Sequence, residues 1–211
     1  MQVMKKIKAM KVRITFVEEV LGTASSNPEI HREFIASKSE DAVKIEEEIE
    51  ALGTDEVIKK ATTIFPRTKK GEPAVWDYQW KGYFKNCCSA LARATGTESS
   101  KLKAFKKIID GLIFVSPRLI EFNLPQGGVI GECQRPLRAQ TPQGERIGLA
   151  HSETVPPGTT LDMEVRWFEL KGRANTLLSE CIREWLDYGS LKGFSQWHNS
   201  GKGRFEWEEI D

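Results

Sequence analysis

The sequence predicts a single α+β domain, and three observations lead to that prediction. Stretches in which apolar and polar residues alternate lie near both ends of the chain and through its second half, which is typical of half-buried strands. Other stretches repeat apolar residues every three or four positions, as amphipathic helices do. No repeat or low-complexity tract divides the 211 residues, which suffice for one sizeable core.

The first predicted strand spans 11–21, where apolar residues from Val12 to Phe16 alternate with polar ones. Before it, residues 1–10 carry lysines and no acid, and we expect a disordered start. After it, residues 28–60 combine many acids with apolar residues at helical spacing. A charged helical insertion is therefore predicted there.

Three further helices are predicted from the spacing of apolar residues. In 75–96 these positions recur every three or four residues from Trp80 onward, and Gly96 can cap the end. A short helix is expected at 101–109 and a final helix at 175–188. A last strand then closes the chain.

The remaining strands complete the order of elements. A short strand and a basic turn are expected at 62–73, and a strand over 112–125 is interrupted by Pro117, as at a sheet edge or a bend. Residues 127–168 are predicted to be β throughout, with a hairpin around a turn at 142–144. The order strand, helix, strands, helix, strand is that of a ferredoxin-like core. The insertion after the first strand and the β-hairpin would extend it.

Composition narrows the functional classes. No apolar run reaches membrane-spanning length, so no contact with a membrane is expected. The four cysteines lack the CxxC spacing of zinc sites, which favours reduced thiols in a cytoplasmic protein. No metal or other cofactor is predicted. The net charge of +1 hides a basic start and an acidic stretch between Glu40 and Glu56.

The glycine-rich stretch near the end of the chain is the first candidate site. Gly193, Gly201 and Gly203 lack a Cβ, so their backbone could approach a phosphate closely, and clustered amides can form an anion-binding concavity. From the residues alone, a flexible turn that joins a helix to an edge strand explains these glycines better.

Side chains beside these glycines would suit a nucleic acid. Lys202 and Arg204 could add charge-assisted contacts to a phosphate. Trp197 and His198 could stack on an unpaired base.

Other basic residues are further candidates for contacts with a phosphate backbone. They lie in a predicted turn, at the start of a helix where free amides favour anions, and in a hairpin. A solvated surface explains the turn and hairpin residues equally well, and it explains the two helix lysines better. The candidates are Arg67 and Lys69, Lys81 and Lys85, and Arg135 and Arg138.

Four stretches, in this order, resemble the CRISPR-associated RAMP superfamily, and most closely its small backbone subunits, which line CRISPR RNA. They are VRITFVEEVLGTAS, the Lys81-Gly82 pair at the opening of a helix, ERIGLAHSETVPPGTTLDMEVRWF, and WLDYGSLKGFSQWHNSGKGRFEW. The resemblance implies a RAMP fold and single-stranded RNA, or single-stranded DNA, as a partner. It also implies self-assembly along a strand or docking onto CRISPR effector subunits.

The resemblance also bears on catalysis. RAMP nucleases that work without metal use a histidine base beside a lysine or tyrosine, and His31 is a weak candidate for that base. Backbone subunits that cleave RNA with a metal use an aspartate after the first strand, and GTASSNPEI has none. We therefore expect a non-enzymatic nucleic-acid-binding protein, with RNA favoured over DNA. The alternatives are an endoribonuclease that uses His31 or His198, and an acidic protein-binding module or CRISPR inhibitor, such as a phage would encode.

Overall fold

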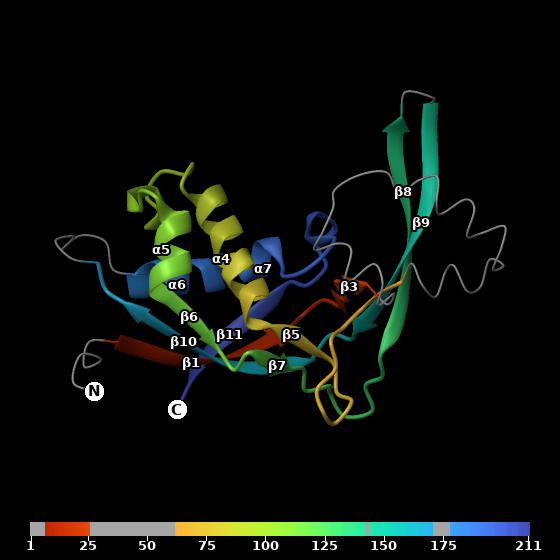
Figure 1. Cartoon of the computed structure of the whole chain (residues 1–211), viewed down its shortest axis with the longest axis horizontal. Coiled ribbons are helices and arrows are strands. Elements are labelled where there is room, and N and C mark those ends of the chain that lie inside the picture. The colour runs from red at the N-terminus through yellow and green to blue at the C-terminus, as the bar shows by residue number, and fades with distance from the viewer. Residues whose placement is uncertain (1–6, 26–61, 142–143, 171–177) are drawn as a thin grey trace.

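The computed structural model of the chain describes four segments: residues 7–25, 62–141, 144–170 and 178–211 (Figure 1). The predicted insertion at 28–60, which contains His31, lies outside these residues. Strand β1 (Ile7–Phe16) begins earlier than the sequence predicted. Residues 7–10 therefore belong to a sheet and not to a disordered start, and Met10 is buried in the core.

A four-stranded sheet, in the order β11-β1-β10-β6, lies at the centre of the fold, and all of its neighbouring strands are antiparallel. The register places Ile14 beside Leu161 of β10 and Trp207 of β11. Alternate residues of β1 and β10 are buried, as the period of two predicted. The strands that join β1 are β6 (Ile113–Ser116), β10 (Thr160–Phe168) and β11 (Phe205–Ile210).

Helices cover one face of this sheet (Figure 1). They are α4 (Asp77–Leu91), α5 (Phe105–Leu112), α6 (Leu178–Asp187) and α7 (Gly189–Lys192). The helix predicted at 101–109 begins later, because Ala104 has a φ of 53° and interrupts the helical path. A separate 3-10 turn, Ser99–Lys101, precedes it. The prediction of a mixed α+β architecture is confirmed.

A second sheet lies beside the first. Strands β8 (Gly131–Thr141) and β9 (Gly144–Val155) form the predicted hairpin, which projects away from the sheet core (Figure 1). At its base, β9 also pairs with β2 (Val20–Leu21) and β4 (Thr63–Ile64), and β4 pairs with β3 (Ala24–Ser25).

The strand predicted over 112–125 is divided in two. Pro117 separates β6 from β7 (Leu119–Glu121), and β7 pairs with β5 (Ala74–Trp76) instead of with the central sheet. Among the described residues, no helix is long and apolar enough to cross a membrane.

An aromatic cluster joins α4 to the end of the chain. Trp80 is fully buried and stacks on Phe194, with ring centroids 4.3 Å apart. Phe205 of β11 meets the Trp80 ring edge-on at 5.6 Å, and Tyr83 donates a hydrogen bond to the Trp185 carbonyl at 3.0 Å. Aromatic pairs of this kind contribute about 0.5–1.5 kcal/mol beyond their burial. The cluster therefore fixes the terminal loop against α4.

The burial of the cysteines gives a test of this core. All four thiols are free, and burial raises the pKa of Cys87 and Cys181 to about 12 and that of Cys88 to about 11. Since the thiolate is the reactive form, DTNB at pH 8 should modify Cys133 alone in the native protein and all four thiols in urea. The native Cys133→Ser variant should therefore show no rapid reaction with DTNB. Rapid native reaction of several thiols would contradict this packing.

Candidate nucleic-acid interface

The backbone amides of the glycines in the terminal loop donate hydrogen bonds to carbonyl groups of the protein itself. The Gly203 amide donates to the Glu19 carbonyl at 2.8 Å, the Gly193 amide to Gly189 at 3.2 Å, and the Gly201 amide to His198 at 3.0 Å. These N–H groups are therefore not free to receive a phosphate. The anion-binding concavity predicted from these glycines is thus replaced by internal hydrogen bonds.

Close packing explains why two of these positions are glycine. Gly193 and Gly203 have φ angles of 76° and 70°, in the left-handed region. A Cβ on Gly193 would lie 2.3 Å from the Lys202 carbonyl oxygen, and one on Gly203 would lie 2.0 Å from that of Phe194. The two arms of the loop thus approach too closely for any side chain.

The cations of this loop are paired with the segment that follows β1. Lys202 forms an ion pair with Glu19, and the Arg204 guanidinium contacts a Glu18 oxygen at 3.0 Å. Arg204 also donates from Nε to the Gly201 carbonyl at 3.2 Å. These contacts hold the loop against the start of the chain and neutralise the two charges that were predicted to bind phosphate.

Arg135 and Trp197 come together at the base of the hairpin. Arg135 of β8 pairs in register with Ala150 of β9, and its side chain is only 8% exposed. Its Nη2 donates to Gln196 Oε1, and its guanidinium lies 5.3 Å from the Trp197 ring centroid. Nη1 is buried and has no hydrogen-bond partner among the described residues. Trp197 itself is 38% exposed.

A pocket of about 250 Å³ adjoins this pair, between α4 and the terminal loop. Polar side chains make up much of its lining: Thr23, Gln79, Tyr83, Asn86, Lys192, Ser195, Gln196 and His198. Gln196 thus both lines the pocket and holds Arg135. The structure therefore brings four of the predicted residues together: Arg135, Gly193, Trp197 and His198. Of these, Gly193 only allows the backbone to turn and offers no group to a ligand.

Hydrogen bonds fix two of the pocket residues. Gln79 Oε1 accepts the Trp76 amide at 2.8 Å, as in a capping box, and its Nε2 donates to Thr23 Oγ1 at 2.6 Å. His198 Nδ1 lies 3.1 Å from the Ser195 carbonyl. Because a carbonyl only accepts, Nδ1 carries the proton in the neutral ring and Nε2 is left as an acceptor.

The other predicted basic residues lie apart from this pocket. Lys85 pairs with the Asp110 carboxylate, and Lys81 donates to the Asp110 carbonyl at 2.9 Å on the α5 side of α4. Burial lowers the pKa of Lys81. Arg67 pairs with Glu153, and Lys69 is exposed in the turn that follows β4. The side chain of Arg138 lies outside the described part of the structure.

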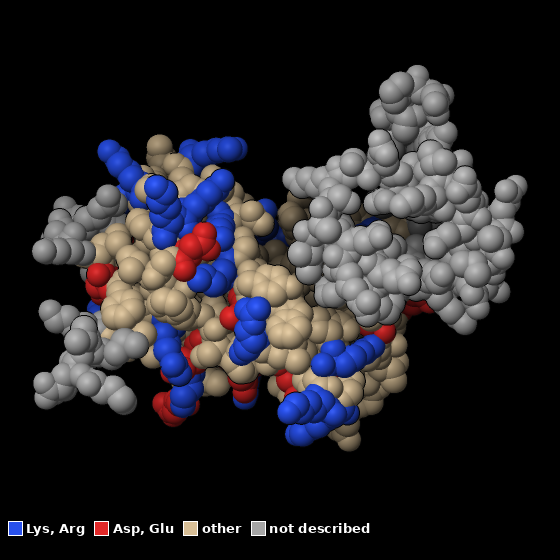
Figure 2. Space-filling view, in the orientation of Figure 1, with Lys and Arg blue, Asp and Glu red and all other residues tan. Residues whose placement is uncertain are grey.

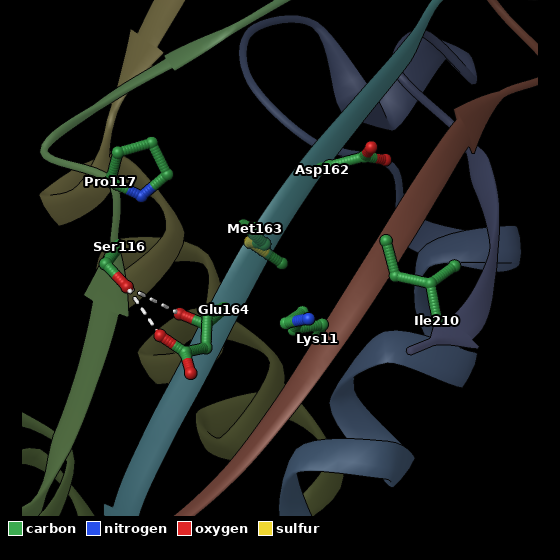
Figure 3. A pocket seen from close by; sticks show the side chains of 7 residues that line it. All are labelled: Lys11, Ser116, Pro117, Asp162, Met163, Glu164 and Ile210. Carbon is green, nitrogen blue, oxygen red and sulfur yellow. Dashed lines mark hydrogen bonds between the residues drawn. The ribbon is translucent and has the colours of Figure 1, made fainter.

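The uncovered face of the central sheet holds a second, shallow pocket of about 310 Å³ (Figure 3). Lys11, Asp162 and Glu164 lie along it. Beside it, Arg13 forms two hydrogen bonds with Asp162, at 2.7 and 2.8 Å, and Arg166 pairs with Glu164. Ion pairs thus occupy this face, and the described residues offer no free basic surface there.

Sequence analysis missed most of the pocket residues, among them Gln79, Asn86, Lys192 and Gln196, because no local pattern marks them. It also missed the lysine-rich run 101–107, which the sequence displays openly as four lysines in seven residues. Within the described segments, no group of three His, Cys, Asp or Glu could hold a metal ion.

Comparison with known proteins identifies the fold. No protein-family model matches the chain, and no curated protein matches it either. A chain of the Type III-B Cmr-beta complex bound to cognate target RNA is similar in structure, with a TM-score of 0.51 and 12% identity. The match covers 98% of this chain and 60% of that one, so this chain spans about 60% of the length of its neighbour.

Two further solved structures match over most of this chain. A chain of a Type IV-B CRISPR complex gives a TM-score of 0.49 at 10% identity, covering 96% of this chain and 90% of that one. Cmr6 from Pyrococcus furiosus gives a TM-score of 0.49 at 11% identity, and the match covers 96% of this chain and 99% of Cmr6. The likeness to the Cmr-beta chain shows a shared fold. The resemblance that the sequence indicated is confirmed at that level.

The packing of the terminal loop can be tested at its glycines. Gly203→Ala should lower the free energy of unfolding by about 1–3 kcal/mol more than Gly71→Ala does. Both glycines have positive φ, at 70° and 88°, but a Cβ on Gly71 meets nothing within 4 Å. Urea denaturation of both variants measures the difference. If both variants lost the same free energy of unfolding, the positive φ angle alone would explain the cost, and the close packing around Gly203 would contribute nothing.

Proposed function

We propose that this protein binds single-stranded nucleic acid, RNA in preference to DNA, at the Arg135–Trp197 pair and its adjoining pocket. The observation that carries the proposal is a buried guanidinium, whose Nη1 has no partner within the described segments, beside a partly exposed indole. A buried donor without a partner costs about 1–3 kcal/mol. An anion that reached this group through a small shift of the loop would recover that energy.

Each part of the site would have a separate task. The exposed side of Trp197 would stack on an unpaired base, and every base offers such a face. Arg135 and Lys192 would attract the phosphates beside that base. Asn86, and the Nε2 of His198, for which the described residues provide no partner, would offer a donor, an acceptor or both to the edge of a base in the pocket.

The fold supports this proposal without deciding it. The similar Cmr-beta chain belongs to a complex bound to target RNA, which is why RNA is our first choice of ligand. We also propose that the central sheet and its helices form a ferredoxin-like core. The strand order β11-β1-β10-β6, with helices after β1 and after β10, favours it.

The partner proteins follow from the same resemblance. Other copies of this chain, or CRISPR effector subunits, are the partners that the resemblance predicts. The alternative of an acidic protein-binding module has less support, since the acidic stretch at 40–56 lies outside the described residues and Glu18 and Glu19 are paired with cations.

Substitution of the indole tests the site directly. Trp197→Ala should weaken binding of a fluorescein-labelled oligouridylate about 5- to 150-fold, because stacking contributes about 1–3 kcal/mol per base. Fluorescence anisotropy at low salt measures the change. Tyr78→Ala is the matched control. Tyr78 is also exposed, and its ring centroid lies 5.4 Å from the Arg118 guanidinium carbon.

The control should change affinity by less than about twofold. Wild-type protein that fails to bind the oligonucleotide at low salt would overturn the proposed function. Equal losses in the two variants would show that the binding site is elsewhere.

A second candidate function, metal-independent RNA cleavage, has one observation in its favour. His198, with Nε2 free as a base, lines the same pocket as Lys192, which could stabilise a developing negative charge. Tyr83 also lines the pocket, but its hydroxyl donates to Trp185 and burial raises its pKa.

Cleavage and binding are separated by one experiment. We expect labelled oligouridylate to stay intact on a denaturing gel after incubation with the protein in EDTA. Cleavage that disappears in His198→Ala, while anisotropy still reports binding, would establish the nuclease instead.

A further inference from the structure

We infer that a bound strand continues from the Trp197 pocket across α4 to a lysine surface at the start of α5. This inference rests on the proposed function and extends it. The lysine surface consists of Arg93, Lys103, Lys106 and Lys107. Figure 2 shows Lys and Arg side chains gathered over this end of the helical layer.

The charges of the lysine surface are free. All four side chains are exposed, and none has an ion pair or side-chain hydrogen bond within the described residues. The nearby acids are already engaged, Glu98 with Lys101 and Asp110 with Lys85. Residues 77–112 contain seven Lys and Arg against three Asp and Glu, whereas the whole chain has a net charge of only +1.

Helix α4 connects this surface to the pocket. Gly82 and Asn86 line the pocket, and Arg93 follows Asn86 by seven residues, which places it just beyond the helix end, on the same side and about 10 Å further along the axis. A Cβ on Gly82 would meet nothing within 4 Å, so open space lies above the helix there. Ser89 and Ala90 lie between Asn86 and Arg93, and their small side chains leave the helix surface accessible there. A strand that leaves the pocket could therefore run along α4, in close contact with it, to the lysine surface.

The chemistry of the lysine surface favours a phosphate backbone over a protein. Protein interfaces have an apolar core with aromatic anchors. The exposed large apolar residues of the described segments all lie elsewhere: Val17, Tyr78, Phe114, Val129, Leu191 and Trp197. Unpaired lysines without such anchors suit the sequence-independent, salt-dependent contacts that nucleic-acid backbones make.

A comparison of ligand lengths tests this path. Fluorescein-labelled oligouridylates of about 5 and about 20 nucleotides span the range of site sizes that single-strand-binding folds show. Lys106→Glu with Lys107→Glu should weaken binding of the long ligand about tenfold or more and that of the short ligand less than about twofold. The slope of log K against log salt for the long ligand should fall by about 1.4, since each lost contact removes about 0.7.

Two controls separate the possible outcomes. Lys8→Glu with Lys70→Glu makes the same change of charge at two exposed positions that are not candidates for the site, and should cause no length-dependent loss. Equal effects of both double variants on both lengths would mean long-range attraction only, and would overturn the inference. Long-ligand binding that Trp197→Ala weakens but the Lys106–Lys107 double variant does not would overturn the inference alone. Absence of all binding would overturn the proposed function as well.

Discussion

The stack of Phe194 on Trp80 is the contact on which the candidate site depends. It fixes the terminal loop to α4 from inside the core, with ring centroids 4.3 Å apart, and two residues later the loop presents Gln196 and Trp197 to the hairpin. Removal of the Phe194 ring would leave a cavity at a cost of about 3–5 kcal/mol and would also free the loop. Stability and site geometry are therefore coupled through one aromatic pair.

Ion pairs decide which cations can reach a ligand. On the uncovered face of the sheet, Arg13 and Arg166 are held by carboxylates, and in the terminal loop Lys202 and Arg204 are held by Glu19 and Glu18. Exposed pairs contribute little to stability, about 0–1 kcal/mol each. Their larger effect here is to remove positive potential from two surfaces. Among the described residues, unpaired positive charge then lies at the start of α5, beside the pocket, and in the turn that holds Lys69 and Lys70.

Local patterns predicted the elements well and the site only in part. Period-two alternation located β1 and β10, and apolar spacing located α4 and α6, because each signal lies within one short window. The partners of the terminal loop could not be predicted in this way. Lys202 and Glu19 are 183 positions apart, and Arg135 and Gln196 are 61 apart. The residues that suggested a phosphate-binding loop instead form hydrogen bonds and ion pairs within the protein. Trp197 and Arg135 are too far apart in the sequence for a local pattern to predict their contact.

The pocket also limits how a base could be distinguished. Both amide atoms of Gln79 are used within the protein, so this residue orients the start of α4 and cannot read a base without breaking those bonds. Asn86, Lys192 and His198 Nε2 have no partner in the part of the chain that the structure describes, and could contact a base edge. With so few free groups, stacking on Trp197 would supply most of the affinity, and stacking tolerates any base. This division of roles suits a protein that follows a strand of varied sequence better than one that selects a single site.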